Sequence, residues 1–159
     1  MSRVPGSAVR VTFTAVLRYF SDCAGGKYSV ANGSTLESCF IDCVAGRYAQ
    51  ITGTSAVTDC IDCAGGKYSV ANGSALESSC IDCVAGKYVE STGSSSDTDC
   101  IDCAGGKYSV ANGSTLESSC IDCVAGKYVE SKGRSAAPDC IECAGGKFSV
   151  DNGHALASS

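Results

Sequence analysis

The most constraining feature of this sequence is a pair of cysteines, written C-x-x-C, that returns every 20 residues. Sixteen residues separate each pair from the next, and the regular pairs are Cys60 with Cys63, Cys80 with Cys83, Cys100 with Cys103, Cys120 with Cys123, and Cys140 with Cys143. Earlier in the chain, Cys39 stands one place before the expected site, which Phe40 occupies, and Cys43 follows. A fixed period of this length predicts an array of small repeated units.

Two versions of the repeat alternate, so the sequence matches itself best every 40 residues. The AGG repeats begin Ala-Gly-Gly, as in Ala64–Cys83, and the VAG repeats begin Val-Ala-Gly, as in Val84–Cys103. Ala104–Cys123 differs from Ala64–Cys83 only in having Thr115 for Ala75. We expect repeats at 23–43, 44–63, 64–83, 84–103, 104–123 and 124–143, a truncated last repeat at 144–159, and a leader or degenerate repeat at 1–22.

The chain contains few of the large apolar side chains that build a protein core. Val, Ile, Leu and Phe number 14, 7, 5 and 4, about 19 % of the 159 residues. A chain below roughly 20 % usually lacks the apolar area to offset its backbone entropy. The 13 cysteines make up about 8 % of the chain, close to the level of a disulfide scaffold. These values exclude a large enzyme with a single core.

The charge of the chain narrows its partners. Its net charge is −5 and it has no basic run. Because nucleic-acid binding depends on clustered Lys and Arg, we expect no nucleic-acid partner. No stretch of 18 apolar residues is present, so we expect no membrane span. Met1–Phe20 carries three arginines and no acid, but Arg10 interrupts its apolar segment. A signal peptide is therefore not convincing.

Short strands and turns are expected within each repeat. Lys67–Val70 has a strand signature, and Asn72-Gly73 favours a tight hairpin turn from which Ala75–Ser78 returns. No helical period persists over ten residues. The predicted fold class is a small disulfide-rich repeat array, an elongated ladder of short β-hairpins and turns with little or no helix.

The cysteine spacing allows two chemistries. Disulfides could close successive loops, of 15 residues in the first and 16 in the others, each contributing roughly 3 kcal/mol: Cys23–Cys39, Cys43–Cys60, Cys63–Cys80, Cys83–Cys100, Cys103–Cys120 and Cys123–Cys140. This scheme leaves Cys143 unpaired, and the next cysteine of the frame would fall at position 160. Crossed pairings between neighbouring C-x-x-C units remain open.

The alternative is an intracellular zinc–thiolate array, because C-x2-C-x16-C-x2-C lies within the spacing of four-cysteine zinc sites, although overlapping sites would compete for ligands. A redox role for C-x-x-C lacks a βαβ context.

The repeat pattern resembles the ephrin-receptor-like cysteine-rich repeat of the growth factor receptor cysteine-rich superfamily, and is similar to the one-disulfide module of tumour necrosis factor receptors. The residues that carry the resemblance are Cys63, Gly66, Lys67, Tyr68, Ser69, Gly73, Ser74 and Cys80, with their equivalents over about residues 21–159. The family usually has Pro after the second cysteine, where this chain has Ala24, Val44, Ala64 or Val84. The resemblance implies an extracellular, elongated, disulfide-linked ladder, often part of a larger surface protein.

Other recurring side chains have a structural and a functional interpretation. We expect one aromatic ring per repeat to pack on the adjacent disulfide, with a sugar-binding row as the alternative: Tyr28, Tyr48, Tyr68, Tyr88, Tyr108, Tyr128 and Phe148. The basic residue before each ring is expected to be solvated and partly paired with the aspartates of the cysteine junctions, or else to form a stripe for an anionic ligand. Asp59 with Asp62, and Asp99 with Asp102, are expected to cap turns, with calcium binding as the alternative. Asn32, Asn72 and Asn112 begin Asn-Gly-Ser glycosylation sequons.

No catalytic constellation is found. The single histidine, His154, lies in the last repeat, and Gly25-Gly26-Lys27 lacks the remainder of a phosphate loop. We therefore expect a non-enzymatic extracellular or cell-surface protein without cofactors, or a fragment of one, acting as a spacer, a stalk or an adhesion surface. Its expected partners are an extracellular protein or a second copy of itself, since near-identical repeats favour multivalent weak binding.

Overall fold

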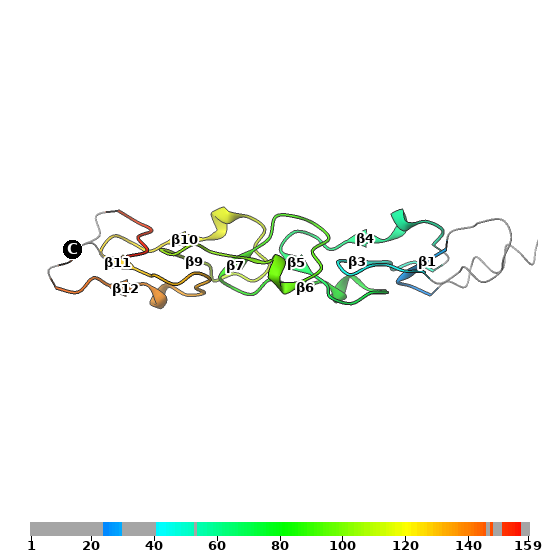
Figure 1. The fold of residues 1–159 in the computed structure, drawn as a ribbon, viewed down its shortest axis with the longest axis horizontal. Coiled ribbons are helices and arrows are strands. Elements are labelled where there is room, and N and C mark those ends of the chain that lie inside the picture. Colours follow the sequence, from blue (N-terminus) through cyan, green and yellow to red (C-terminus); the bar gives the residue numbers. More distant parts are fainter. Residues whose placement is uncertain (1–23, 30–40, 53, 146, 148–150, 157–159) are drawn as a thin grey trace, which may run out of the picture.

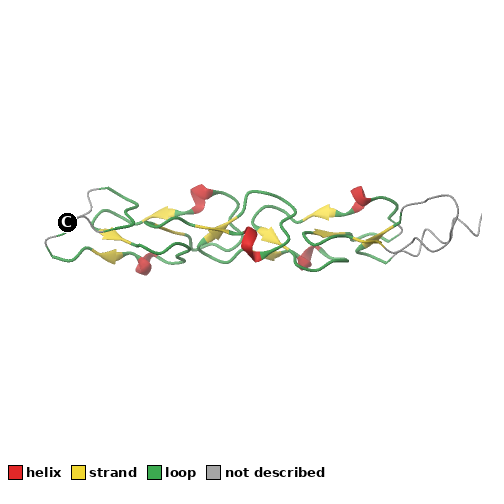
Figure 2. Cartoon of the chain, in the orientation of Figure 1, coloured by secondary structure: helices red, strands yellow, loops and turns green. Residues whose placement is uncertain are grey.

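The computed structural model describes residues 24–29, 41–52, 54–145, 147 and 151–156, and these form an elongated array (Figure 1). The cysteines Cys23 and Cys39 and the sequon at Asn32 lie outside the described residues. Loops and turns account for most of the described chain (Figure 2), which contains no α-helix. The predicted fold class, a disulfide-rich array of small hairpins, is confirmed.

Twelve two-residue strands and five 3₁₀ helices recur in a fixed order along the described chain. The strands are β1 Lys27–Tyr28, β2 Ile41–Asp42, β3 Arg47–Tyr48, β4 Ile61–Asp62, β5 Lys67–Tyr68, β6 Ile81–Asp82, β7 Lys87–Tyr88, β8 Ile101–Asp102, β9 Lys107–Tyr108, β10 Ile121–Asp122, β11 Lys127–Tyr128 and β12 Ile141–Glu142. The 3₁₀ helices are η2 Val57–Asp59, η3 Glu77–Ser79, η4 Asp97–Asp99, η5 Glu117–Ser119 and η6 Ala137–Asp139.

Each hairpin joins the aromatic position of one repeat to the C-x-x-C that ends it. In the hairpin of β5 and β6, Lys67 pairs with Asp82 and Tyr68 with Ile81, antiparallel. The predicted return strand at Ala75–Ser78 is wrong, because part of that segment lies in η3 and the partner strand comes three residues after it. The reason is the tether at Cys80, whose disulfide to Cys63 brings Ile81 beside Tyr68.

The Asn-Gly turn docks on an earlier repeat instead of closing a hairpin. Gly73 has φ +67°, but among the described residues only glycines have positive φ, so the turn lacks the two positive φ values of a type I′ hairpin turn. The Gly73 N–H donates to the carbonyl of Cys43 at 2.8 Å. The turn therefore contributes to the contact between repeats.

Backbone hydrogen bonds continue the ladder from one repeat to the next. The Gly66 N–H donates to the Val89 carbonyl at 2.7 Å, and the Ser69 N–H donates to the Ser94 carbonyl at 3.0 Å. Tyr68 and Ser94 also form a parallel β-bridge. Equivalent bonds recur at 20-residue intervals, so each repeat satisfies part of its backbone only through its neighbour.

A glycine contact reaches two repeats along the chain. Gly66 has φ +79°, and a Cβ placed there would lie 2.1 Å from the carbonyl oxygen of Gly113. No side chain fits at that distance, and the left-handed backbone independently favours glycine. The same arrangement joins Gly86 to Gly133. A repeat is thus held by the next two repeats as well as by its own disulfide.

The apolar core is divided among the junctions between repeats. Tyr68 packs on the Cys83–Cys100 disulfide and Val89 of the following repeat, and Tyr28, Tyr48 and Tyr108 pack on the next disulfide in the same way. The prediction that the ring packs on the adjacent disulfide is confirmed for these four. Because these four rings pack on the disulfide of the following loop, the repeats that carry them do not contain a complete core of their own.

Candidate functional site: the disulfide junctions

Five disulfides form the repeated centre of the structure. They are Cys43–Cys60, Cys63–Cys80, Cys83–Cys100, Cys103–Cys120 and Cys123–Cys140, with Cα–Cα distances of 5.6–5.8 Å. Each bond joins cysteines 17 positions apart, which is the uncrossed scheme expected from the spacing. Cys143 is a free, partly exposed thiol.

These bonds occupy the sulfur atoms that a zinc array would need. The C-x2-C-x16-C-x2-C sets do not ligate a metal in this structure, since their cysteines bond to one another. Within the part of the chain that the structure describes, no group of three or more His, Cys, Asp and Glu side chains could hold a metal ion. Among the described residues, neither Asp59 with Asp62 nor Asp99 with Asp102 belongs to such a group, as a calcium site would require.

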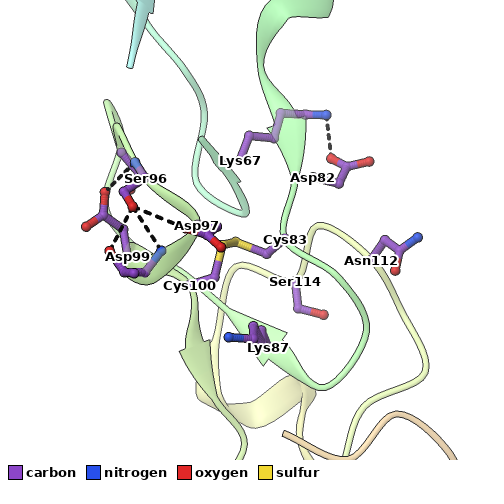
Figure 3. Close-up of a disulfide and its surroundings, with 12 residues drawn as sticks. Lys67, Asp82, Cys83, Lys87, Ser96, Asp97, Asp99, Cys100, Asn112 and Ser114 are labelled. Atoms are coloured by element: carbon purple, nitrogen blue, oxygen red, sulfur yellow. Dashed lines mark hydrogen bonds and ion pairs between the residues drawn. A yellow bond between two sulfur atoms is a disulfide. The ribbon is translucent and has the colours of Figure 1, made fainter. Parts of the chain in front are cut away.

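A capped 3₁₀ turn leads into the second cysteine of each VAG loop. The Asp99 carboxylate accepts hydrogen bonds from the backbone N–H groups of Ser95 and Ser96, at 2.8 and 3.1 Å. The Ser96 hydroxyl oxygen in turn accepts from the Thr98 N–H at 3.2 Å, and Figure 3 shows Ser96 and Asp99 beside the Cys83–Cys100 bond. Asp59 makes the equivalent bonds. The capping role predicted for Asp59 and Asp99 is therefore confirmed, and it holds the turn that places the cysteine.

Ion pairs cross the hairpins beside the disulfides. Lys67 Nζ lies 2.5 Å from Asp82 Oδ1 (Figure 3). The predicted pairing of the basic residue before each ring with an aspartate of a C-x-x-C pair is confirmed here and in four more pairs: Lys27 with Asp42, Arg47 with Asp62, Lys87 with Asp102, and Lys107 with Asp122. Side chains of Lys67 and Asp82 are 34 % and 48 % exposed, so each pair contributes at most about 1 kcal/mol. The pairing already engages these cations, which argues against a stripe that binds anions.

One open hollow of about 580 Å³ is lined by residues that include Tyr88, Glu90 and Asp99. Burial of the phenol raises the pKa of Tyr88, and the negative charges of Glu117 and Glu90 raise it further. The hollow has a single aromatic side chain in its lining. It therefore does not provide the row of stacked rings expected of the sugar-binding alternative.

The asparagine of the AGG repeats makes a contact that the sequence analysis missed. Asn72 Oδ1 accepts the Ala45 N–H at 2.8 Å, and Asn112 Oδ1 accepts the Ala85 N–H at 2.8 Å. Ser74 and Ser114, the other polar residues of the sequons, are buried at 7 % and 6 % exposure. The sequence pattern that could have indicated these contacts is the 40-residue period, because the asparagine occurs only in AGG repeats and each bond joins an AGG repeat to a VAG repeat.

Comparison with known proteins does not assign this chain to a family. No protein-family model matches it, and no curated protein matches it. Among the described residues, no helix is long and apolar enough to cross a membrane. The chain is a cysteine-rich repeat protein, and its several disulfides fit an oxidising environment.

Proposed function

We propose that this chain is a non-enzymatic spacer or stalk of an extracellular or cell-surface protein, built from repeats of the ephrin-receptor-like kind. The observation that carries the proposal is the uninterrupted bonding along the array. Every junction within residues 43–140 combines a disulfide with backbone hydrogen bonds to the next repeat. A rod made in this way holds its two ends apart.

The regularity of the junctions supports this function. The Gly66 to Val89 bond recurs as Gly86 to Ser109 and Gly106 to Val129, at 2.7–2.8 Å. In such an array each repeat adds the same interface, so length follows the number of repeats. Tandem addition of a 40-residue unit would lengthen the rod without altering its ends.

Deleting residues 64–103 tests the proposal. The deletion joins Cys63 to Ala104 and preserves the alternation of repeats and the cysteine frame. A spacer predicts that small-angle scattering shows a rod shortened by two repeats, with an unchanged cross-section and all remaining disulfides formed. A compact particle, or a length that does not change with repeat number, would contradict it.

Self-association is a second candidate function, favoured by a row of exposed isoleucines. Six isoleucines recur at 20-residue intervals, and each is between 39 % and 57 % exposed: Ile41, Ile61, Ile81, Ile101, Ile121 and Ile141. Identical apolar positions allow many weak contacts to add up. Sedimentation of the chain and of its Ile81→Ser, Ile101→Ser variant tests this role. Concentration-dependent association that the variant lowers supports it, and a monomer at all concentrations contradicts it.

A further inference from the structure

Exposed asparagines stand at the turns of the AGG repeats, and their contacts use one atom of the amide. Asn72 and Asn112 are exposed, and each accepts a backbone N–H through Oδ1 at 2.8 Å. An amide substituted on Nδ2 keeps its carbonyl oxygen as an acceptor. A group attached to that nitrogen is therefore compatible with the hydrogen bond that holds the turn.

At two positions of the AGG repeat Ala64–Cys83, exposed apolar side chains stand where the next VAG repeat has polar ones. Val70 and Leu76 are 64 % and 60 % exposed, whereas the corresponding VAG positions hold Glu90 and Ser96. Val110 and Leu116 are likewise exposed, at 63 % and 53 %. A bulky polar group on the asparagine between them in sequence would shield apolar surface that otherwise invites association.

From these observations we propose that Asn72 and Asn112 carry N-linked glycans, one on each of two successive AGG repeats. In the transfer, Nδ2 bonds to the anomeric carbon of a polyprenyl-diphosphate-linked oligosaccharide. The bond from that carbon to the diphosphate oxygen breaks, the diphosphate leaves with the electron pair, and one amide proton is lost to a base. No oxidation or reduction is involved. The Asn-Gly-Ser sequence supplies the acceptor motif. The proposal rests on the extracellular setting of the proposed function.

The fold fixes when the glycan is added. Ser74, which completes the sequon, is 7 % exposed and its hydroxyl donates to the Ala71 carbonyl at 3.3 Å. Asn72 lies inside the loop that Cys63–Cys80 closes. The hydroxyl is thus accessible to an enzyme only before this loop folds, and modification must precede closure of the disulfide.

The fourth AGG repeat provides an internal control. Asn152 Oδ1 accepts the Ala125 N–H at 2.9 Å, and Gly153 has φ +77°, so the turn is the same. His154 stands where the sequon requires Ser or Thr. Asn152 therefore shares the chemistry of an Asn-Gly bond, including spontaneous deamidation, but is not an acceptor.

The experiment is secretion of the chain from eukaryotic cells, followed by enzymatic release of N-glycans in ¹⁸O-water and peptide mass spectrometry. We expect ¹⁸O-labelled Asp at positions 72 and 112 and only background label at 152. Ser74→Ala should remove the label at 72 alone, and His154→Ser should add label at 152. Adding a mild reductant during synthesis should raise occupancy at 72 and 112.

Three results would overturn the proposal. Equal label at positions 72, 112 and 152 in the unaltered chain would show deamidation only. Label at position 152 in His154→Ser without label at 72 and 112 would show that the cell glycosylates a sequon at this turn but leaves Asn72 and Asn112 unmodified. Absence of label in both chains would show that this turn is not an acceptor. Thiol alkylation of the same samples separates these from failure of the proposed function, in which the loop cysteines would be free.

Discussion

Pulling the chain from its two ends should lengthen it only as far as its disulfides allow. In the oxidised chain, force passes along Cys60–Cys63, across the Cys63–Cys80 bridge and on to the next C-x-x-C. The three backbone steps span at most about 10 Å, and the bridge adds a Cα–Cα distance of 5.6 Å. A fully stretched oxidised repeat thus measures roughly 16 Å, against about 70 Å for 20 residues of reduced chain.

Reduction under force should therefore release length in equal steps. Each bridge encloses 17 backbone steps, so its cleavage adds about 54 Å after the bridge itself is subtracted. Optical tweezers can record the steps before and after a phosphine reductant is added. The step size reports the pairing, because a bond within one C-x-x-C would release only about 5 Å, and a bridge that skips a loop would release more than 100 Å. Steps of about 54 Å in the absence of reductant would refute closed loops.

Substitutions of Gly66, Tyr68 and Tyr88 test the packing and electrostatics of the array, with Gly126→Ala as a control. Gly66→Ala should destabilise the fold by about 2–4 kcal/mol in denaturant titration, because strain from its φ adds to the clash with Gly113. Gly126→Ala, whose Cβ meets nothing within 4 Å at φ +85°, should lose only the strain, about 1–2 kcal/mol, and equal losses would contradict the close contact. Tyr68→Ala should cost about 2–4 kcal/mol through the cavity beside the next disulfide; a change below about 1 kcal/mol in thermal or denaturant unfolding would contradict that packing. The raised pKa of Tyr88 favours its protonated form in the fold. The contribution of protonated Tyr88 to the free energy of unfolding should therefore be complete below pH 10, which is near the ordinary pKa of tyrosine. It should be lost as the pH rises through the pKa that Tyr88 has in the fold. The difference in phenolate absorbance between the native chain and Tyr88→Phe reports the ionisation of Tyr88, and its midpoint should lie above pH 10. A midpoint at the ordinary pKa of tyrosine would contradict the prediction.

The contacts that follow from the type and spacing of the residues could be predicted from the sequence, both within a repeat and across its junction with the next. The distance from Cys63 to Cys80 suits a closed loop, the ring of Tyr68 needed an apolar partner in a chain with few of them, and Lys67 needed a counter-charge. Each follows from spacing and residue type, because the partners lie less than one period or one junction away.

The contacts between repeats could not be predicted in the same way. The approach of Gly66 to Gly113 and the bond from Ala45 to Asn72 both depend on which copy lies beside which. Near-identical copies carry almost no information about this, since every candidate partner has the same residue type. Only the alternation of AGG and VAG repeats signals contacts between unlike neighbours.

Alkylation and intact mass of the native chain distinguish an array held by disulfides from one held by zinc or built with free thiols. The five bridges of the structure, together with the Cys23–Cys39 pair expected from the cysteine spacing, predict that one cysteine reacts without reductant and that peptide mapping places it at Cys143, while all 13 cysteines react after reduction. Reaction of all 13 after treatment with a chelator alone would contradict this prediction.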